Sequence, residues 1–137
     1  MRWMLTPMWR YFDFSGRSCR KEFWLFFLLQ FVALAALAVW IYSILVEIGE
    51  HGNTGHVIDD AAGPLGIGLS LFSIFVLITA IPGIAVQVRR LHDQDMSGLL
   101  ALLNLVPVGG LVLLVFMCFE GTKGSNRFGP DPLAARP

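Results

Sequence analysis

The sequence predicts an all-α integral membrane protein with three transmembrane helices, an N-terminal interfacial helix and a turn-rich C-terminal tail. Three stretches without a charged residue carry this prediction: residues 23–46, 64–88 and 99–119. A helix rises about 1.5 Å per residue, so roughly 20 apolar residues cross a hydrocarbon core. Composition agrees, since 55% of the residues are hydrophobic and 15% are charged, against about 25% charged in a soluble domain. We expect one transmembrane domain over residues 1–137.

The segment before the first span is rich in aromatic and basic residues, which favour the membrane interface. Thr6 and Pro7 fit the N-cap and the first position of a helix, so residues 7–13 are expected to form a short interfacial helix. The alternative is a disordered leader. The first apolar stretch starts too late and is too long for a cleavable signal peptide.

The predicted spans contain small residues and a few amides. Gly66 with Ser70, and Thr79 with Gly83, have the small-xxx-small spacing that lets helices approach closely. An unpaired amide in hydrocarbon is costly, so each amide is expected to face protein or the interface. The three amides are Gln30, Gln87 and Asn104.

The distribution of Lys and Arg predicts the topology, because these residues are retained on the cytoplasmic side. Seven of the ten lie in the leader or at residues 89 and 90, whereas the linker 47–63 is acidic and has none. We therefore expect a cytoplasmic N-terminus and an external acidic linker. Three spans would also place the tail, residues 120–137, outside. That leaves three basic residues on the disfavoured side: Lys123, Arg127 and Arg136.

An alternative topology removes this conflict. Residues 106–110 read VPVGG and would break the third stretch into a re-entrant hairpin, which returns the tail to the cytoplasm. Because 21 residues are few for two lipid-facing arms, and re-entrant backbone must be buried in protein, three spans are preferred. On that model Cys19 and Cys118 lie at opposite membrane faces and do not pair.

Three motifs resemble one family. Residues 14–24 read FSGRSCRKEFW, residues 89–93 read RRLHD with Ser-Gly at 97–98, and residues 121–132 read GTKGSNRFGPDP. In this order around the spans they are similar to the small bacterial inner-membrane proteins of the domain of unknown function 805 family. The family usually has paired aromatics where this chain has Leu99 and Leu100. The resemblance implies a bacterial inner-membrane location and no known activity, so it supplies no catalytic residue.

The charged residues flanking the first two spans are the strongest candidate site. Opposite charges at one membrane face are expected to pair across the helix ends and to clamp the leader against the second linker. The set lacks a nucleophile beside a base, so an enzyme reading is weak. The members of this predicted cytoplasmic clamp are Arg17, Arg20, Glu22, Arg89, Arg90, His92 and Asp93.

No catalytic, cofactor or metal site is expected. The residue types in the acidic linker suit a metal, but their spacing matches no ligand motif, and a solvated loop is the simpler reading. The residues concerned are His51, His56, Asp59 and Asp60.

The function expected from these observations is non-enzymatic. The chain would act by helix association in the lipid bilayer, as a homo-oligomer or as an accessory to another membrane protein. A formal net charge of zero gives no reason to expect nucleic acid as a partner. The alternative is an oligomeric transporter or channel lined by the three amides and kinked at Pro82.

Overall fold

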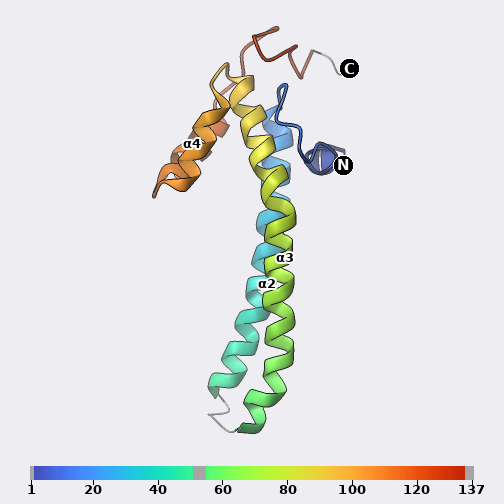
Figure 1. Ribbon diagram of the computed structural model, residues 1–137, viewed down its shortest axis with the longest axis vertical. Coiled ribbons are helices and arrows are strands. Elements are labelled where there is room, and N and C mark those ends of the chain that lie inside the picture. The colour runs from blue at the N-terminus through green and yellow to red at the C-terminus, as the bar shows by residue number, and fades with distance from the viewer. Residues whose placement is uncertain (1, 51–54, 135–137) are drawn as a thin grey trace. The chain divides into compact units, whose positions relative to one another are not determined.

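The computed structural model describes residues 2–50 and 55–134. In chain order the elements are α1 (Arg2–Trp9), α2 (Arg20–Glu50), α3 (Gly55–Asp93), the 3-10 helix η1 (Gly98–Leu105) and α4 (Gly109–Cys118) (Figure 1). Over the described residues there is no β-strand, and one isolated bridge joins Asn126 to Gly129. The predicted all-α class is therefore confirmed.

The chain forms two compact units. The cap unit comprises Met1–Leu28 and Ala80–Pro137, and the two-helix unit comprises Leu29–Thr79. The boundary falls within α2 and within α3, so each unit contains a part of both helices.

Helices α2 and α3 are the two described helices that are long and apolar enough to cross a membrane. They contain the predicted spans 23–46 and 64–88 and extend beyond both. The linker is accordingly shorter than the expected 47–63, since α2 continues to Glu50 and α3 begins at Gly55. His56, Asp59 and Asp60 therefore lie in a helix and not in the expected loop, while His51 falls outside the described residues.

In the two-helix unit, the α2 and α3 segments run antiparallel. The Gln30 amide donates a 3.2 Å hydrogen bond to the Thr79 carbonyl. Further along, a Cβ atom on Gly68 would lie 3.1 Å from Ile41 Cγ1 and 3.3 Å from Trp40 Cζ3. Gly68 therefore lets the two backbones approach, as small residues do in helix pairs that span membranes.

The third apolar stretch is not the continuous helix expected over residues 99–119. Residues 98–105 form η1, a turn follows, and α4 has 10 residues. Pro107 has no N–H to donate to a helix. Val108 adopts a left-handed φ of 68°, which a helix does not tolerate. The two short helices pack on each other, so the stretch is a helical hairpin, the arrangement that had been the less preferred alternative.

Gly109 is required at the apex of this hairpin. A Cβ atom there would lie 2.0 Å from the Leu103 carbonyl oxygen, which belongs to the backbone and has no freedom to rotate away. At the neighbouring Gly110, a Cβ atom would lie 3.6 Å from Asn104 Oδ1, which is an ordinary contact.

The cap unit has its own apolar core. Its buried members come from α2, the last turns of α3, η1 and α4. They are Phe23, Phe26, Val86, Leu91, Ala101, Leu113 and Met117. Leu113 and Met117 are fully buried, so one face of α4 is held in this core, while Leu111 and Val115 on its other faces are exposed.

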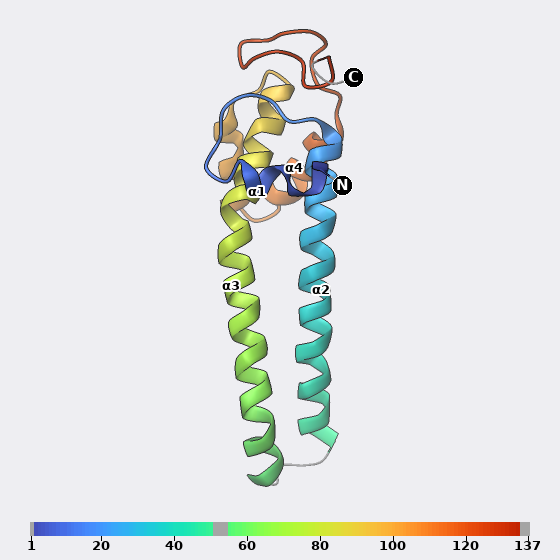
Figure 2. The same ribbon diagram turned by 90° about the vertical axis from the view of Figure 1, so that its right-hand side faces the viewer.

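The N-terminal helix differs from the prediction in its limits. It spans Arg2–Trp9 rather than residues 7–13, and Pro7 lies inside it instead of at its first position. Within the cap unit, α1 lies across the adjoining ends of α2 and α3 and not along them (Figure 2). Leu5 and Trp9 of this helix are exposed.

The hairpin gives a direct test of the fold. Gly109→Ala forces a Cβ atom against fixed backbone, and we expect it to lower the free energy of unfolding by about 1–3 kcal/mol, the usual effect of overpacking. Gly110→Ala is the matched control and should change stability by less than about 0.5 kcal/mol. Thermal unfolding in detergent measures both. Equal effects of the two substitutions would contradict the hairpin geometry.

Candidate functional site

A tight turn in the leader sets the position of the first arginine of the charged cluster. Asp13 accepts hydrogen bonds from the Ser15 hydroxyl, from the Arg10 Nε at 2.8 Å and from the Ser15 amide at 3.0 Å. The Ser15 hydroxyl bond, with help from Arg10, lowers the pKa of Asp13 to about 2. Gly16 follows with a φ of 75°, a conformation that glycine adopts freely. The chain then turns back, and the Ser18 amide donates to the Arg89 carbonyl at 3.1 Å.

Arg89 joins α3 to the leader and to α2. Its side chain is fully buried, and its Nη2 lies 3.4 Å from Glu22 Oε1 at the start of α2. Its Nε donates to the Ser18 hydroxyl at 3.0 Å, and its Nη1 donates to the Arg10 and Asp13 carbonyls. Each guanidinium nitrogen therefore has an acceptor, which is the condition for burying a charge at tolerable cost.

Asp93 is the centre of the cluster. One carboxylate oxygen accepts from Arg17 Nε at 2.9 Å, and the other pairs with Arg90 Nη1. The exposed fractions of the Arg17, Arg90 and Asp93 side chains are 1%, 0% and 6%. Arg90 also donates through Nη2 to the Phe119 carbonyl at the end of α4. The pair formed within α3 is thus Arg90 with Asp93, one turn apart.

Arg17 also binds the C-terminal tail. Its Nη1 donates to the Gly124 carbonyl at 2.6 Å, and its Nη2 donates to the Thr122 carbonyl at 2.5 Å. The Thr122 amide donates in turn to the Asp93 carbonyl at 2.8 Å. One guanidinium therefore connects the leader, the end of α3 and the tail.

Two tail residues that charge-based reasoning missed complete the cluster. A Cβ atom on Gly121 would lie 2.0 Å from Asp93 Oδ2, so this position has room only for glycine. The Asn126 amide donates to the His92 carbonyl and to the Thr122 hydroxyl, at 2.9 Å each. Both residues lie in the motif 121–132, so the signal was present in the sequence, but nothing local indicated that the tail folds back onto α3.

Two predicted members lie at the edge of the cluster. Arg20 pairs at 3.1 Å with Glu120, which is exposed, and not with an acid of the predicted set. The His92 ring stacks on Phe128 with centroids 3.9 Å apart, and its Nδ1 lies 3.3 Å from the Gly16 carbonyl. The structure thus brings Arg17, Glu22, Arg89, Arg90 and Asp93 into one buried group, with Arg20 and His92 beside it.

The hairpin also changes the placement of the cysteines. Arg20, the neighbour of Cys19, has its Nη1 3.4 Å from the Cys118 carbonyl. This proximity contradicts the three-span arrangement from which opposite membrane faces were expected for Cys19 and Cys118, because the chain reverses at residues 106–108. Both are free thiols, Cys19 buried and Cys118 exposed.

The contacts of this cluster join four chain segments: the leader, the start of α2, the end of α3 and the tail. The Ser18 and Thr122 hydroxyls are both engaged in its hydrogen bonds. Among the residues that the structure describes, no group of three or more His, Cys, Asp or Glu side chains is placed to hold a metal ion.

Removal of the central carboxylate tests the importance of the junction. Asp93→Asn leaves two buried guanidinium groups without a counter-charge, and we expect a loss of about 3–5 kcal/mol in the free energy of unfolding. Asp95→Asn is the control, since Asp95 is exposed, pairs with Arg127 at 3.0 Å and has a φ of 58° that asparagine also adopts. The Asp95→Asn variant should lose less than about 1 kcal/mol in the free energy of unfolding. Thermal unfolding in detergent compares the two, and similar losses would contradict a buried junction.

Comparison with known proteins agrees with the motifs. The family model described as "Protein of unknown function (DUF805)" matches residues 11–130. The chain is 42% identical to inner membrane protein YhaI of Escherichia coli strain K12 over 96% of both chains. It is 38% identical to inner membrane protein YhaH of the same strain, over 96% of this chain and 97% of that protein. No solved structure matches. The chain therefore belongs to the DUF805 family of proteins of unknown function.

Proposed function

We propose that this chain is a non-enzymatic protein of the bacterial inner membrane that works through lateral association of its helices, as a homo-oligomer or as an accessory subunit. The observation that carries the proposal is how little of the two apolar helices the chain itself covers. In the 18-residue apolar segment that marks each helix as a candidate span, 6% of the α2 segment and 22% of the α3 segment are buried within the chain. The remaining surface is left for lipid and for other helices. The location follows from the two inner-membrane relatives.

The polar groups of the apolar segments support association over transport. Gln30 is bonded to the Thr79 carbonyl, and the Thr79 hydroxyl donates to the Phe75 carbonyl at 2.8 Å. In the cap unit, the Asn104 amide donates to Gln87 Oε1 at 2.6 Å. The three amides proposed to line a path therefore have partners within the chain, so they provide no argument for a transporter or channel.

The geometry favours a topology with two membrane-spanning helices and a one-sided hairpin, meaning a hairpin that enters one leaflet and returns to the side from which it started. The α4 helix of 10 residues is about 15 Å long, half of a hydrocarbon core. The hairpin apex is apolar and exposed at Leu105, Val106 and Val108, which suits insertion into one leaflet. Its base is held in the cap unit by Leu113 and Met117, as re-entrant backbone requires.

The same topology explains the charges. The leader, the end of α3 and the tail are bonded together in the cap unit, so all ten Lys and Arg residues would lie on the cytoplasmic side. The acidic residues of the linker, with no Lys or Arg among them, would face outward. In this setting α1, lying across the helix ends with Trp9 exposed, suits the interfacial position. The charged cluster then serves as the clamp that fixes the cytoplasmic face.

Reporter fusions test the topology. A reporter that is active only outside the cytoplasm, fused after Asn53, after Gln94 or after Pro137, should be active at Asn53 and silent at the other two. The Asn53 fusion is also the control for reporter folding. An active fusion after Pro137 would restore the three-span arrangement and reject the one-sided hairpin.

Substitutions at two glycines of α3 distinguish helix association between chains from helix packing within one chain. Outside the adjoining backbone of α3, no atom lies within 4 Å of a Cβ built on Gly66, whereas a Cβ built on Gly68 meets Ile41 and Trp40. Gly66 and Ser70 are exposed, one turn apart. We expect Gly66→Leu to dissociate an assembly in native nanodiscs while the melting temperature stays unchanged. Gly68→Leu should lower the melting temperature through intramolecular strain.

Light scattering and affinity capture in native nanodiscs supply the measurement. If the wild-type chain is monomeric and captures no membrane protein, the association proposal is wrong. It is also contradicted if Gly66→Leu retains the wild-type assembly.

A further inference from the structure

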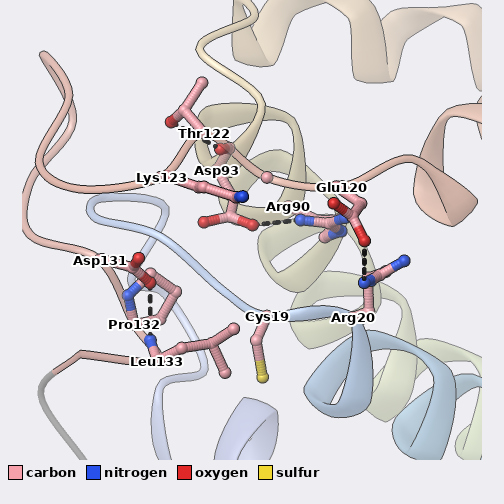
Figure 3. A pocket seen from close by; sticks show the side chains of 11 residues that line it. Cys19, Arg20, Arg90, Asp93, Glu120, Thr122, Lys123, Asp131, Pro132 and Leu133 are labelled. Carbon is pink, nitrogen blue, oxygen red and sulfur yellow. Dashed lines mark hydrogen bonds and ion pairs between the residues drawn. The ribbon is translucent and has the colours of Figure 1, made fainter.

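Two ion pairs lie in the wall of the cavity beside the charged cluster, Arg90 with Asp93 and Arg20 with Glu120 (Figure 3). Both are closed within the chain, so neither pair needs a partner from outside. Elsewhere in the cap unit, a side chain with apolar neighbours has only part of its hydrogen-bonding capacity filled. It is the carboxamide of Gln87, near the end of α3.

Asn104 in η1 fixes the orientation of the Gln87 amide. Asn104 Nδ2 donates to the Ala101 carbonyl at 3.0 Å and to Gln87 Oε1 at 2.6 Å. Because a carbonyl oxygen only accepts, the first bond identifies the nitrogen end of the Asn104 amide, and the second bond then identifies the facing atom of Gln87 as oxygen. Gln87 therefore uses its oxygen within the chain and leaves its nitrogen to donate elsewhere.

Gln87 Nε2 reaches the surface without an acceptor. It donates no hydrogen bond to any residue that the structure describes. The Gln87 side chain is half-buried. Among the buried and half-buried residues described, Arg90 Nε is the one side-chain nitrogen or oxygen that is cut off from solvent and lacks a partner. Gln87 Nε2 must therefore retain surface that another molecule can reach.

The surroundings of this amide are apolar. Gln87 belongs to the charge-free stretch 64–88. Ile84, one turn earlier in α3, is exposed, and so is Leu105, the neighbour of Asn104. An N–H group beside hydrocarbon costs free energy when it is left unpaired. An acceptor supplied by another molecule would therefore stabilise this surface.

We propose that Gln87 pairs with the Gln87 of a second copy of this chain, across a two-fold axis along the membrane normal. This inference rests on the proposed association and names a residue at its interface. A primary amide is self-complementary, since Nε2 donates and Oε1 has a second lone pair beside the one that Asn104 uses. Two copies therefore form two reciprocal hydrogen bonds, as an isologous interface requires.

The membrane favours a second copy over a different protein as the partner. Copies inserted with the same topology are parallel, so the same residue of each lies at the same depth. A different protein would need an amide of its own at that depth. The exposed residues Ala80 and Ile84 precede Gln87 by seven and three positions, which is the spacing of residues that face a partner helix. Gly66 precedes Gln87 in the sequence by three such seven-residue repeats.

Cross-linking tests whether this face meets itself. Ile84→Cys keeps the Gln87 amide, and it is made in a Cys19→Ala, Cys118→Ala background and oxidised with copper phenanthroline in lipid vesicles. Leu111→Cys in the same background is the control, because Leu111 is exposed on α4 and reports chance encounters. We expect several times more covalent dimer from Ile84→Cys. Equal yields from the two positions would overturn the proposed axis.

The amide itself is tested by energy transfer between copies labelled at the exposed Cys118, in a Cys19→Ala background, as the protein-to-lipid ratio is varied. Gln87→Leu should weaken association on the order of tenfold, as expected for two lost hydrogen bonds between membrane helices. Gln30→Leu is the matched control, because the Gln30 amide donates to the Thr79 carbonyl within the chain. It should lower the melting temperature and leave association unchanged.

Gln87→Glu keeps the test valid if Gln87→Leu unfolds. A carboxylate pair on a two-fold axis repels, whereas protonated carboxyl groups again donate and accept. This variant should therefore dissociate at neutral pH and reassociate at acidic pH, while the wild-type chain shows no such change. Association of the variant that does not depend on pH would contradict pairing at Gln87.

The outcomes separate this inference from the association on which it rests. A monomeric wild-type chain would overturn both. If Gly66→Leu dissociates the assembly and Gln87→Leu does not, association stands and the role of Gln87 is wrong. If Gln87→Leu abolishes capture of a different membrane protein by a chain that is itself monomeric, the amide serves that protein, and the pairing of two copies is overturned.

Discussion

The buried carboxylate of Asp93, shared between Arg17 and Arg90, is the interaction on which the rest of this structure depends. A charge removed from water is stable only when it is paired and its hydrogen bonds are filled. Arg17 fills its remaining donors with tail carbonyls, and Arg89 fills its donors with leader carbonyls and Glu22. Separating the leader, the helix ends or the tail would leave buried charges without partners, which is energetically costly. These segments must therefore stay together.

This requirement constrains the backbone elsewhere. If the tail must reach Asp93, the third apolar stretch has to return to the side from which it started, and a single spanning helix does not do so. Gly109 supplies the close approach at the apex, where a Cβ atom would lie 2.0 Å from a backbone oxygen. Gly121 supplies the close approach at Asp93. Gly109 at the start of α4 and Gly121 just beyond its end therefore make it sterically feasible for the hairpin to form and for the tail to reach Asp93.

The sequence was sufficient to predict α2 and α3, because long uncharged stretches depend on composition and length alone. It was misleading for residues 99–119, because the same criteria do not detect a left-handed residue at Val108 after Pro107. The pairing of Arg89 with Glu22 and of Arg17 with Asp93 lies within the set that opposite charges at helix ends had indicated. The Arg20 partner was missed, since Glu120 reaches it only when the hairpin brings the tail back.

The cooperative character of the junction is the central claim, and hydrogen exchange of the Arg17→Gln variant in nanodiscs tests it most directly. The Ser18 amide is bonded to Arg89, and the Thr122 amide is bonded to Asp93, so they report on the leader and on the tail separately. If one buried network holds both segments, the two amides should lose protection together and to a similar extent. Loss of protection at Ser18 with full retention at Thr122 would mean that the segments are held independently, and would contradict this account.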